Sequence, residues 1–226
     1  MPNYITSSIS WRTVPDSMNP FLSIWTQPRA TIRGIVDTDP TRNVIALAAT
    51  GPALSSLLRQ WSAAMNGTAN QSVLWPLFVA FNVASRAVLG ILLLYVSGVV
   101  FRWSGALLGG TASRTEVRTA LAWSQVPGIV VAIVLMLALF AGVPMPKVLP
   151  GQLPQIDPAF YKVLVVVVPL AIWGFFIGLK CLGEVHRFSS WRALGAILIP
   201  ALVAMLAAVA ITLAVFWFAS IAGGHR

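Results

Sequence analysis

Two groups of polar residues in this 226-residue chain could do chemistry, and the first lies inside an apolar stretch. Arg86 sits there, with Asn82 one helical turn before it and Ser85 beside it. An ionisable side chain in a membrane-spanning helix indicates either a ligand or ion pathway or a long side chain that reaches for water. With a span over residues 80–101, Arg86 lies about 9 Å from the outer end, at about 1.5 Å per residue, so both interpretations stay open. Asp157 is the carboxylate best placed to pair with it.

The second group lies in two polar connections that we expect on one side of a membrane, gathered into one polar cluster. Its members are Arg114, Glu116, Arg118, Glu184, His186 and Arg187. This cluster either closes the end of a helical bundle with ion pairs or docks a protein partner or lipid headgroups. Lys180 and Glu184 are four residues apart, a spacing that permits a salt bridge. One histidine beside one glutamate is a poor zinc site, since zinc prefers three or four ligands, so no metal site is predicted.

Catalytic motifs are missing from the sequence. The predicted spans contain no Asp or Glu, which removes the proton-relay carboxylate of coupled pumps. A phosphate-cradling Gly-Lys motif, a His-Glu zinc motif and a Ser-His-Asp set are also absent. We therefore predict a non-enzymatic protein with no catalytic residues and no cofactor.

The composition assigns the chain to membranes. Apolar residues make up 58% and charged residues 9%, with a mean hydropathy of +0.82, far from the values of soluble domains. The stretch from Ala193 to Ile221 runs 29 residues without a charge, and roughly 20 apolar residues suffice to cross a bilayer. The net charge of +9 is interpreted as membrane topology rather than as nucleic-acid binding. The fold class is therefore all-α, a polytopic membrane protein.

Five membrane-spanning helices are predicted. They cover about 43–65, 73–101, 121–143, 159–179 and 193–221. The first is the least apolar, because Arg59 and Gln60 lie near its end. Asp39 is expected to cap its N-terminus, with Pro40 at the first helical position. Residues 1–42 then form a cytosolic N-terminal segment and residues 43–226 a five-span bundle.

Basic residues in the short connections set the orientation. Ten of fifteen fall on one predicted side: Arg12, Arg29, Arg33, Arg42, Arg102, Arg114, Arg118, Lys180, Arg187 and Arg192. The opposite side holds Arg59, Lys147, Lys162 and Arg226. The N-terminus is therefore predicted in the cytosol and the C-terminus outside, with Trp103, Trp123 and Trp191 at the inner interface.

The segment before the first span predicts an amphipathic interfacial helix. Ile32, Ile35 and Val36 recur at helical spacing after Pro28, with arginines on the opposite face. Such a helix either lies on an anionic cytosolic leaflet or caps the cytosolic end of the bundle. Two glycine pairs, at 105/109 and 174/178, have the spacing that lets helices approach closely, within the chain or between copies.

Three motifs carry a resemblance to a known family. They are Asn19-Pro-Phe-Leu-Ser-Ile-Trp-Thr-Gln-Pro-Arg29 with Asp37-Thr-Asp39-Pro40, then Ala122-Trp-Ser-Gln-Val-Pro127, and then Leu182-Gly-Glu184-Val-His186-Arg-Phe188-Ser189. Together they resemble prokaryotic members of the Yip family, the relatives of the Ypt/Rab-GTPase-interacting membrane proteins, over residues 19–221.

The resemblance implies a five-span fold in a prokaryotic cytoplasmic membrane and a role in membrane organisation or trafficking-type processes. We interpret the chain as a non-catalytic scaffold or adaptor. Its expected partners are membrane lipids, a protein on the cytosolic face and further copies of the chain, and no nucleic acid. The alternative is a small transporter, channel or lipid-translocating protein with a polar pathway near Arg86.

Overall fold

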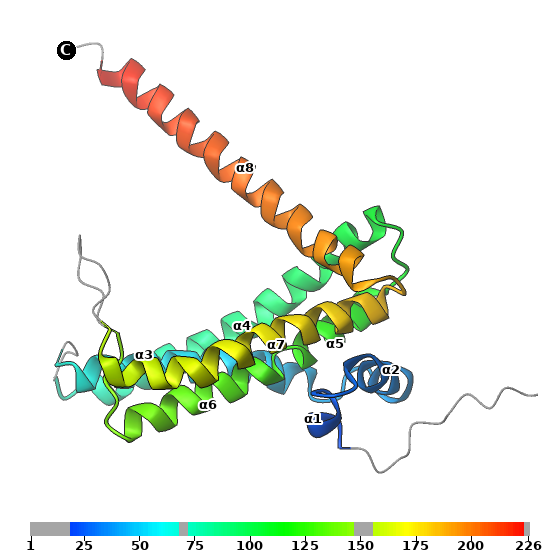
Figure 1. Cartoon of the computed structure of the whole chain (residues 1–226). Coiled ribbons are helices and arrows are strands. Elements are labelled where there is room, and N and C mark those ends of the chain that lie inside the picture. The colour runs from blue at the N-terminus through cyan, green and yellow to red at the C-terminus, as the bar shows by residue number, and fades with distance from the viewer. Residues whose placement is uncertain (1–18, 68–71, 147–155, 224–226) are drawn as a thin grey trace, which may run out of the picture.

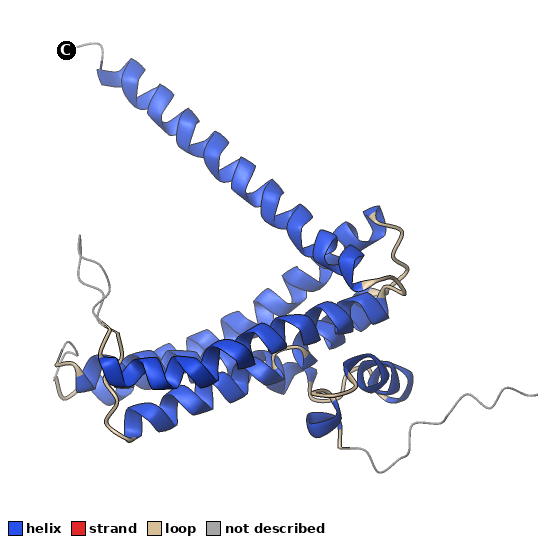
Figure 2. Cartoon of the chain, viewed as in Figure 1, coloured by secondary structure: helices blue, strands red, loops and turns tan. Residues whose placement is uncertain are grey.

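The structure, a computed structural model, describes residues 19–67, 72–146 and 156–223, and all its regular elements there are α-helices (Figures 1 and 2). Arg12, Lys147 and Arg226 of the charge count lie outside these ranges. The helices are α1 (Pro20–Ser23), α2 (Pro28–Thr38), α3 (Val44–Met65), α4 (Trp75–Leu107), α5 (Arg114–Trp123), α6 (Val126–Phe140), α7 (Pro158–Val185) and α8 (Ser190–Gly223).

Four long helices are apolar enough to cross a membrane. In the described chain these segments are Trp75–Leu107, Arg114–Phe140, Pro158–Val185 and Ser190–Phe218, the second of which joins α5 and α6. At most 28% of the most apolar window of each is buried inside the molecule. Large apolar side chains such as Phe81, Val165 and Leu202 therefore lie on the surface, where lipid can cover them. This is the architecture of an integral membrane protein.

The predicted first span forms a helix, α3, that is not among these four segments. Its residues include Arg59 and Gln60 near the C-terminal end, and these lower its hydropathy. In the bundle, α3 packs between α4 and α6, and α6 packs against α7 (Figure 1). The five-span arrangement stays a prediction.

Several helices run past the ends predicted from hydropathy. The second span was expected to end at 101, but α4 continues to Leu107, and α7 continues to Val185 rather than 179. The predicted spans end where the charged residues Arg102 and Lys180 lower the hydropathy. The backbone hydrogen bonds of a helix can continue past such residues into water. The helices therefore extend beyond their apolar segments.

Asp39 does not cap α3, so that prediction is wrong. Its carboxylate accepts hydrogen bonds from the Thr41 backbone N–H at 3.0 Å and the Thr41 hydroxyl at 2.7 Å. These bonds stabilise the charged form and lower the pKa of the Asp39 carboxyl. Helix α3 instead begins at Val44, after Asn43 in the left-handed region at φ 56°. Thr41, two residues along, is the nearer partner for the Asp39 side chain.

The buried core lies at one end of the molecule. It is built where α1, α2, α5, the C-terminal part of α7 and the first turns of α8 meet, and it includes Ile24, Ile32, Ile35, Val117, Trp123, Ile177, Leu182, Val185, Ala193 and Ala196. Trp123 was expected at the membrane interface, but it is fully buried in this core. Its position in a polar connection suggested the interface, whereas packing of the N-terminal segment over α5 covers it.

Helix α8 leaves the bundle after this core. Its first turns pack on α4 and α7, and the Ser104 hydroxyl donates a hydrogen bond to the Ala196 carbonyl at 2.7 Å. From Ala201 to Phe218 every residue is exposed, and α8 diverges from the other helices (Figure 1). Pro200 lies where the packing ends.

The glycine pair on α7 packs within the chain. A Cβ added at Gly174 would lie 2.8 Å from Cβ of Pro127 on α6, and one added at Gly178 would lie 3.7 Å from Cβ of Ser124. The α6–α7 contact therefore needs a glycine at position 174.

Gly174→Val is expected to lower the free energy of unfolding by about 1–3 kcal/mol, because overpacking pushes α6 away from α7. Denaturant unfolding of the purified protein in detergent measures this. Gly128→Val is the matched control, since a Cβ at Gly128 meets nothing within 4 Å. Equal destabilisation by both variants would contradict the packing argument.

Candidate functional site

Aromatic side chains anchor the N-terminal segment to the bundle. The Trp123 indole N–H donates to the Arg42 carbonyl at 3.2 Å, and the Trp173 indole N–H donates to the Trp25 carbonyl at 3.1 Å. The Phe21 ring lies against Trp123, with ring centroids 4.8 Å apart. Helices α1 and α2 are therefore held on the end of the bundle where α7 turns into α8.

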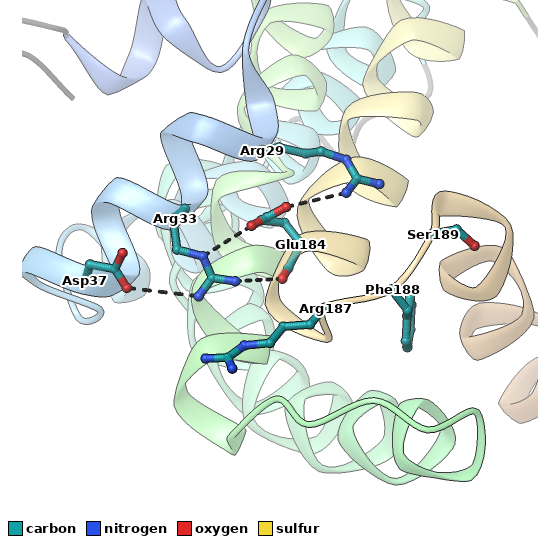
Figure 3. Close-up of a pocket in the computed structure, with 7 residues that line it drawn as sticks. All are labelled: Arg29, Arg33, Asp37, Glu184, Arg187, Phe188 and Ser189. Atoms are coloured by element: carbon teal, nitrogen blue, oxygen red, sulfur yellow. Dashed lines mark hydrogen bonds and ion pairs between the residues drawn. The ribbon is translucent and has the colours of Figure 1, made fainter. Parts of the chain in front are cut away.

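Glu184, in the last turn of α7, links α2 to the bundle (Figure 3). One carboxylate oxygen accepts from Nε of Arg33 at 3.2 Å, and the other accepts from Arg29 at 3.4 Å. Arg33 also donates to the Glu184 carbonyl at 2.9 Å. The Glu184 side chain is 24% exposed, so water screens these ion pairs only in part. Arg29 makes a further bond to the Ser190 hydroxyl at 3.2 Å, which joins α2 to the start of α8.

Arg187 follows α7 in a backbone conformation that favours glycine. Its φ is 59°, and the Phe188 N–H donates to the Gly183 carbonyl at 2.9 Å, which closes the helix end. A residue with a Cβ costs about 1–2 kcal/mol in this left-handed region. The chain therefore holds an exposed arginine where glycine is the less strained residue.

An open cleft of about 1050 Å³ lies between α2 and the α7–α8 connection. Its lining residues are Arg29, Arg33, Asp37, Glu184, Arg187, Phe188 and Ser189 (Figure 3). Three arginines face two carboxylates, so the lining carries a net positive charge. Guanidinium groups and a serine hydroxyl suit an anion with several oxygen acceptors. We call this set of seven residues the basic cleft.

His186 is buried beside the basic cleft without a hydrogen-bond partner for either ring nitrogen among the described residues. Its ring is stacked on Phe188 with centroids 5.0 Å apart, and its carbonyl accepts from the Thr111 N–H at 3.4 Å. A Cβ at Gly105 would lie 2.2 Å from the imidazole, so α4 must present a glycine there. Burial lowers the pKa of His186, which favours the neutral ring.

The model of the Yip1 domain matches residues 22–224 of the chain, which include every residue of the basic cleft. The chain belongs to the Yip1 domain family. No curated protein and no solved structure matches it. The resemblance inferred from the three motifs is confirmed, and Glu184, His186 and Arg187 of the third motif lie in or beside the basic cleft of this Yip1-domain protein.

The six predicted polar residues of the connections are divided between α5 and the end of α7. Glu116 accepts from the Ser113 N–H at 2.6 Å and caps α5, while Arg118 lies 4.6 Å over the Tyr95 ring and donates to the Arg114 carbonyl at 3.2 Å. Only Glu184 and Arg187 line the basic cleft. Local contacts engage the Glu116 and Arg118 side chains. Burial lowers the pKa of His186, and the nearby charge of Glu116 opposes that shift. A binding role for these residues stays a prediction.

Two predicted ion pairs are replaced by other contacts. Asp157 accepts from the Ala159 N–H at 2.8 Å and caps α7, so its carboxylate serves the helix rather than Arg86. Lys180 Nζ lies 5.2 Å over the Trp173 ring, whereas the carboxylate of Glu184 binds Arg29 and Arg33.

Arg86 and Asn82 lie apart from the basic cleft, on α4. Arg86 is exposed, and the Asn82 amide donates to the Phe78 carbonyl at 2.9 Å within its own helix. An apolar groove of about 770 Å³ separates the neighbouring parts of α3 and α4, and neither residue lines it. Their role in a pathway stays a prediction.

Five residues of the basic cleft were not among the predicted site residues: Arg29, Arg33, Asp37, Phe188 and Ser189. A sequence signal existed for three of them. Arg29, Arg33 and Asp37 recur every four residues and so share one face of α2. The sequence left open whether this helix lies on an anionic leaflet or caps the bundle, because nothing in it shows that this face meets the end of α7.

Glu184→Gln is expected to expose α2 to trypsin. Loss of the carboxylate charge weakens two partly exposed ion pairs, together worth about 1 kcal/mol, which raises the open fraction of α2 about fivefold. Cleavage after Arg29 and Arg33 should accelerate by a similar factor.

Asp37→Asn is the control for this prediction. Asp37 is 62% exposed and lies 4.0 Å from Arg33, so its loss should leave the cleavage rate unchanged. Equal rates for Glu184→Gln and the wild-type protein would show that Glu184 does not hold α2.

The stability of this Yip1-domain protein is expected to fall as the pH falls below about 7. The folded state keeps His186 neutral, because burial lowers its pKa below the ordinary value of about 6.5. The unfolded chain therefore binds the extra proton first, and the free energy of unfolding decreases as the pH passes downward through about 6.5. Above that value the contribution is complete and constant.

Unfolding midpoints measured between pH 8 and pH 5 check this prediction. His186→Gln should flatten the slope near pH 6.5, since it removes the group that titrates there. A slope of the same size in the variant would assign the pH dependence to other groups.

Proposed function

We propose that this Yip1-domain protein is a non-catalytic scaffold or adaptor of a prokaryotic cytoplasmic membrane. It acts through lipid and partner-protein contacts on its cytosolic face. One observation carries the proposal: Glu184 fixes the N-terminal segment to the connection between the last two membrane helices, and a basic cleft opens between them. A charged surface held by ion pairs at the end of an apolar bundle suits the binding of lipids or proteins rather than transport through the bundle.

The proposal includes five spans, with α3 as the first. Its 22 residues extend about 33 Å, enough for a hydrocarbon core of about 30 Å. Packing between α4 and α6 supports a spanning position, since both neighbours belong to membrane-spanning segments. Arg59 near the outer end can reach the interface with its long side chain. An odd number of spans puts the two termini on opposite sides, and the basic residues favour a cytosolic N-terminus and an outside C-terminus.

The N-terminal segment is proposed to cap the bundle at the cytosolic interface. Ile32 and Ile35 of α2 are buried against the bundle, which leaves them unable to enter lipid at the same time. This supports the capping interpretation over a helix inserted in the leaflet. The polar face of α2 then contributes to the cytosolic surface, where a partner or a second copy of the chain can dock.

A conduit through the bundle has less support. The predicted polar residues of such a pathway, Asn82 and Arg86, lie outside the groove between α3 and α4, and Asn82 bonds to its own helix.

The composition of the native particle tests the scaffold proposal. The protein, purified from its own membrane in mild detergent, is expected to carry a stoichiometric protein partner. Arg33→Gln should deplete that partner, because it breaks the Glu184 contact and alters the basic cleft, whereas Arg86→Gln should retain it. Quantitative mass spectrometry of cross-linked particles measures both.

A partner lost in Arg86→Gln and retained in Arg33→Gln would contradict this function. A particle without a partner, together with ion or lipid flux that depends on Arg86, would establish the conduit instead.

A further inference from the structure

We propose that the basic cleft binds the terminal phosphate of an anionic membrane lipid, and that Arg187 is the principal contact. The ligand chemistry is a phosphate monoester, held at the end of the membrane helices. The inference deepens the proposed function and rests on it for the placement of the cleft at the cytosolic leaflet.

The position of the cleft in the chain places it at headgroup depth. His186, Arg187, Phe188 and Ser189 connect α7 to α8, and both helices are apolar enough to span the membrane. So short a connection cannot rise far from the bilayer surface. Trp191, in the first turn of α8, is 82% exposed, and tryptophan is the residue that prefers the membrane–water interface.

The charges of the cleft leave one arginine available. Glu184 binds Arg29 and Arg33, while no acidic side chain among the described residues lies within ion-pair distance of Arg187. Figure 3 shows its side chain extending along the cleft toward the side of Arg33 and Asp37. A planar guanidinium can bind two phosphate oxygens at once.

The arrangement of donors favours a monoester over a diester. Arg187 comes from the α7–α8 connection, and the remaining N–H groups of Arg29 and Arg33 come from α2 on the other wall. Donors on opposite walls need free oxygens on more than one side of the phosphorus. A terminal phosphate has three such oxygens, whereas the phosphate of a diester has two. The cleft volume of about 1050 Å³ leaves room for the attached glycerol.

The backbone gives an independent indication that Arg187 serves a ligand. The φ of 59° at the helix end is the conformation that glycine adopts without strain, and the arginine side chain makes no ion pair that would repay the strain among the described residues. Strained residues of this kind concentrate at binding sites. The left-handed backbone at position 187 closes the end of α7, and the arginine side chain at this position is explained by ligand binding.

Because of this strain, a glycine at position 187 tests the side chain without destabilising the fold. Arg187→Gly removes the guanidinium and suits the left-handed backbone, so the unfolding temperature without ligand should stay the same or rise. Affinity for dioctanoyl phosphatidic acid, measured by native mass spectrometry of the full chain in detergent, should fall at least tenfold. Arg187→Lys should give an intermediate affinity, because it keeps the charge and loses the two-point geometry. Arg102→Gln is the control, an exposed arginine of α4 outside the cleft, and should bind like the wild type.

Each of the following results would overturn the proposal. Equal affinity of Arg187→Gly and the wild-type protein would remove Arg187 from the site. Binding of inorganic phosphate as tight as that of the lipid would assign the cleft to a soluble anion. Displacement of the lipid by a lower concentration of a polyglutamate peptide would assign it to an acidic protein segment.

The lipid-binding measurement needs no protein partner. Its failure would therefore leave the protein partner of the native particle in place, and loss of that partner would leave lipid binding measurable. Dioctanoyl phosphatidylcholine, a diester, should bind at least tenfold more weakly than phosphatidic acid, and equal binding would contradict the monoester assignment.

Discussion

The carboxylate of Glu184 is the constraint on which the end of the protein where α7 turns into α8 depends. It lies at the end of a membrane helix, and it binds two arginines that precede it by about 150 residues in the chain. A partly buried carboxylate needs such partners, since an unpaired charge in this position is costly. Two charge-assisted bonds, with a third from Arg33 to the Glu184 carbonyl, place α2 over the α7–α8 connection and so create one wall of the basic cleft.

The apolar segments were predictable from sequence because lipid solvation acts on each helix independently. Four predicted spans correspond to helices long and apolar enough to cross a membrane, while Arg59 and Gln60 keep α3 outside that group. Contacts between distant segments were not predictable. Glu184 was identified as a site residue, but its partners depend on the docking of α2, which one sequence does not encode in any local pattern. For Asp39 and Asp157 the local contacts were missed. Their carboxylates accept hydrogen bonds from backbone N–H groups two residues along, whereas other roles had been predicted for them.

The residues that carried the family resemblance meet in space. Phe21 from the first motif lies against Trp123 from the second, and Arg29 binds Glu184 from the third. All of them lie at the end of the bundle where the buried core is concentrated. The rest of the bundle is a set of apolar helices whose exposed surfaces lipid can cover. In this Yip1-domain protein, specific side-chain recognition and the recognisable motifs therefore occupy the same place.

Helix α8 lies at an angle to the other long helices, so the molecule is narrow at one end and wide at the other (Figure 1). At one end α8 touches α4 and α7, and beyond Pro200 it moves steadily away from them. Its apolar segment of 29 residues extends about 43 Å and fits a hydrocarbon core of about 30 Å only when tilted. The two leaflets must then accommodate unequal cross-sectional areas around one protein. We expect a protein of this shape to favour curved regions of the bilayer without any specific ligand.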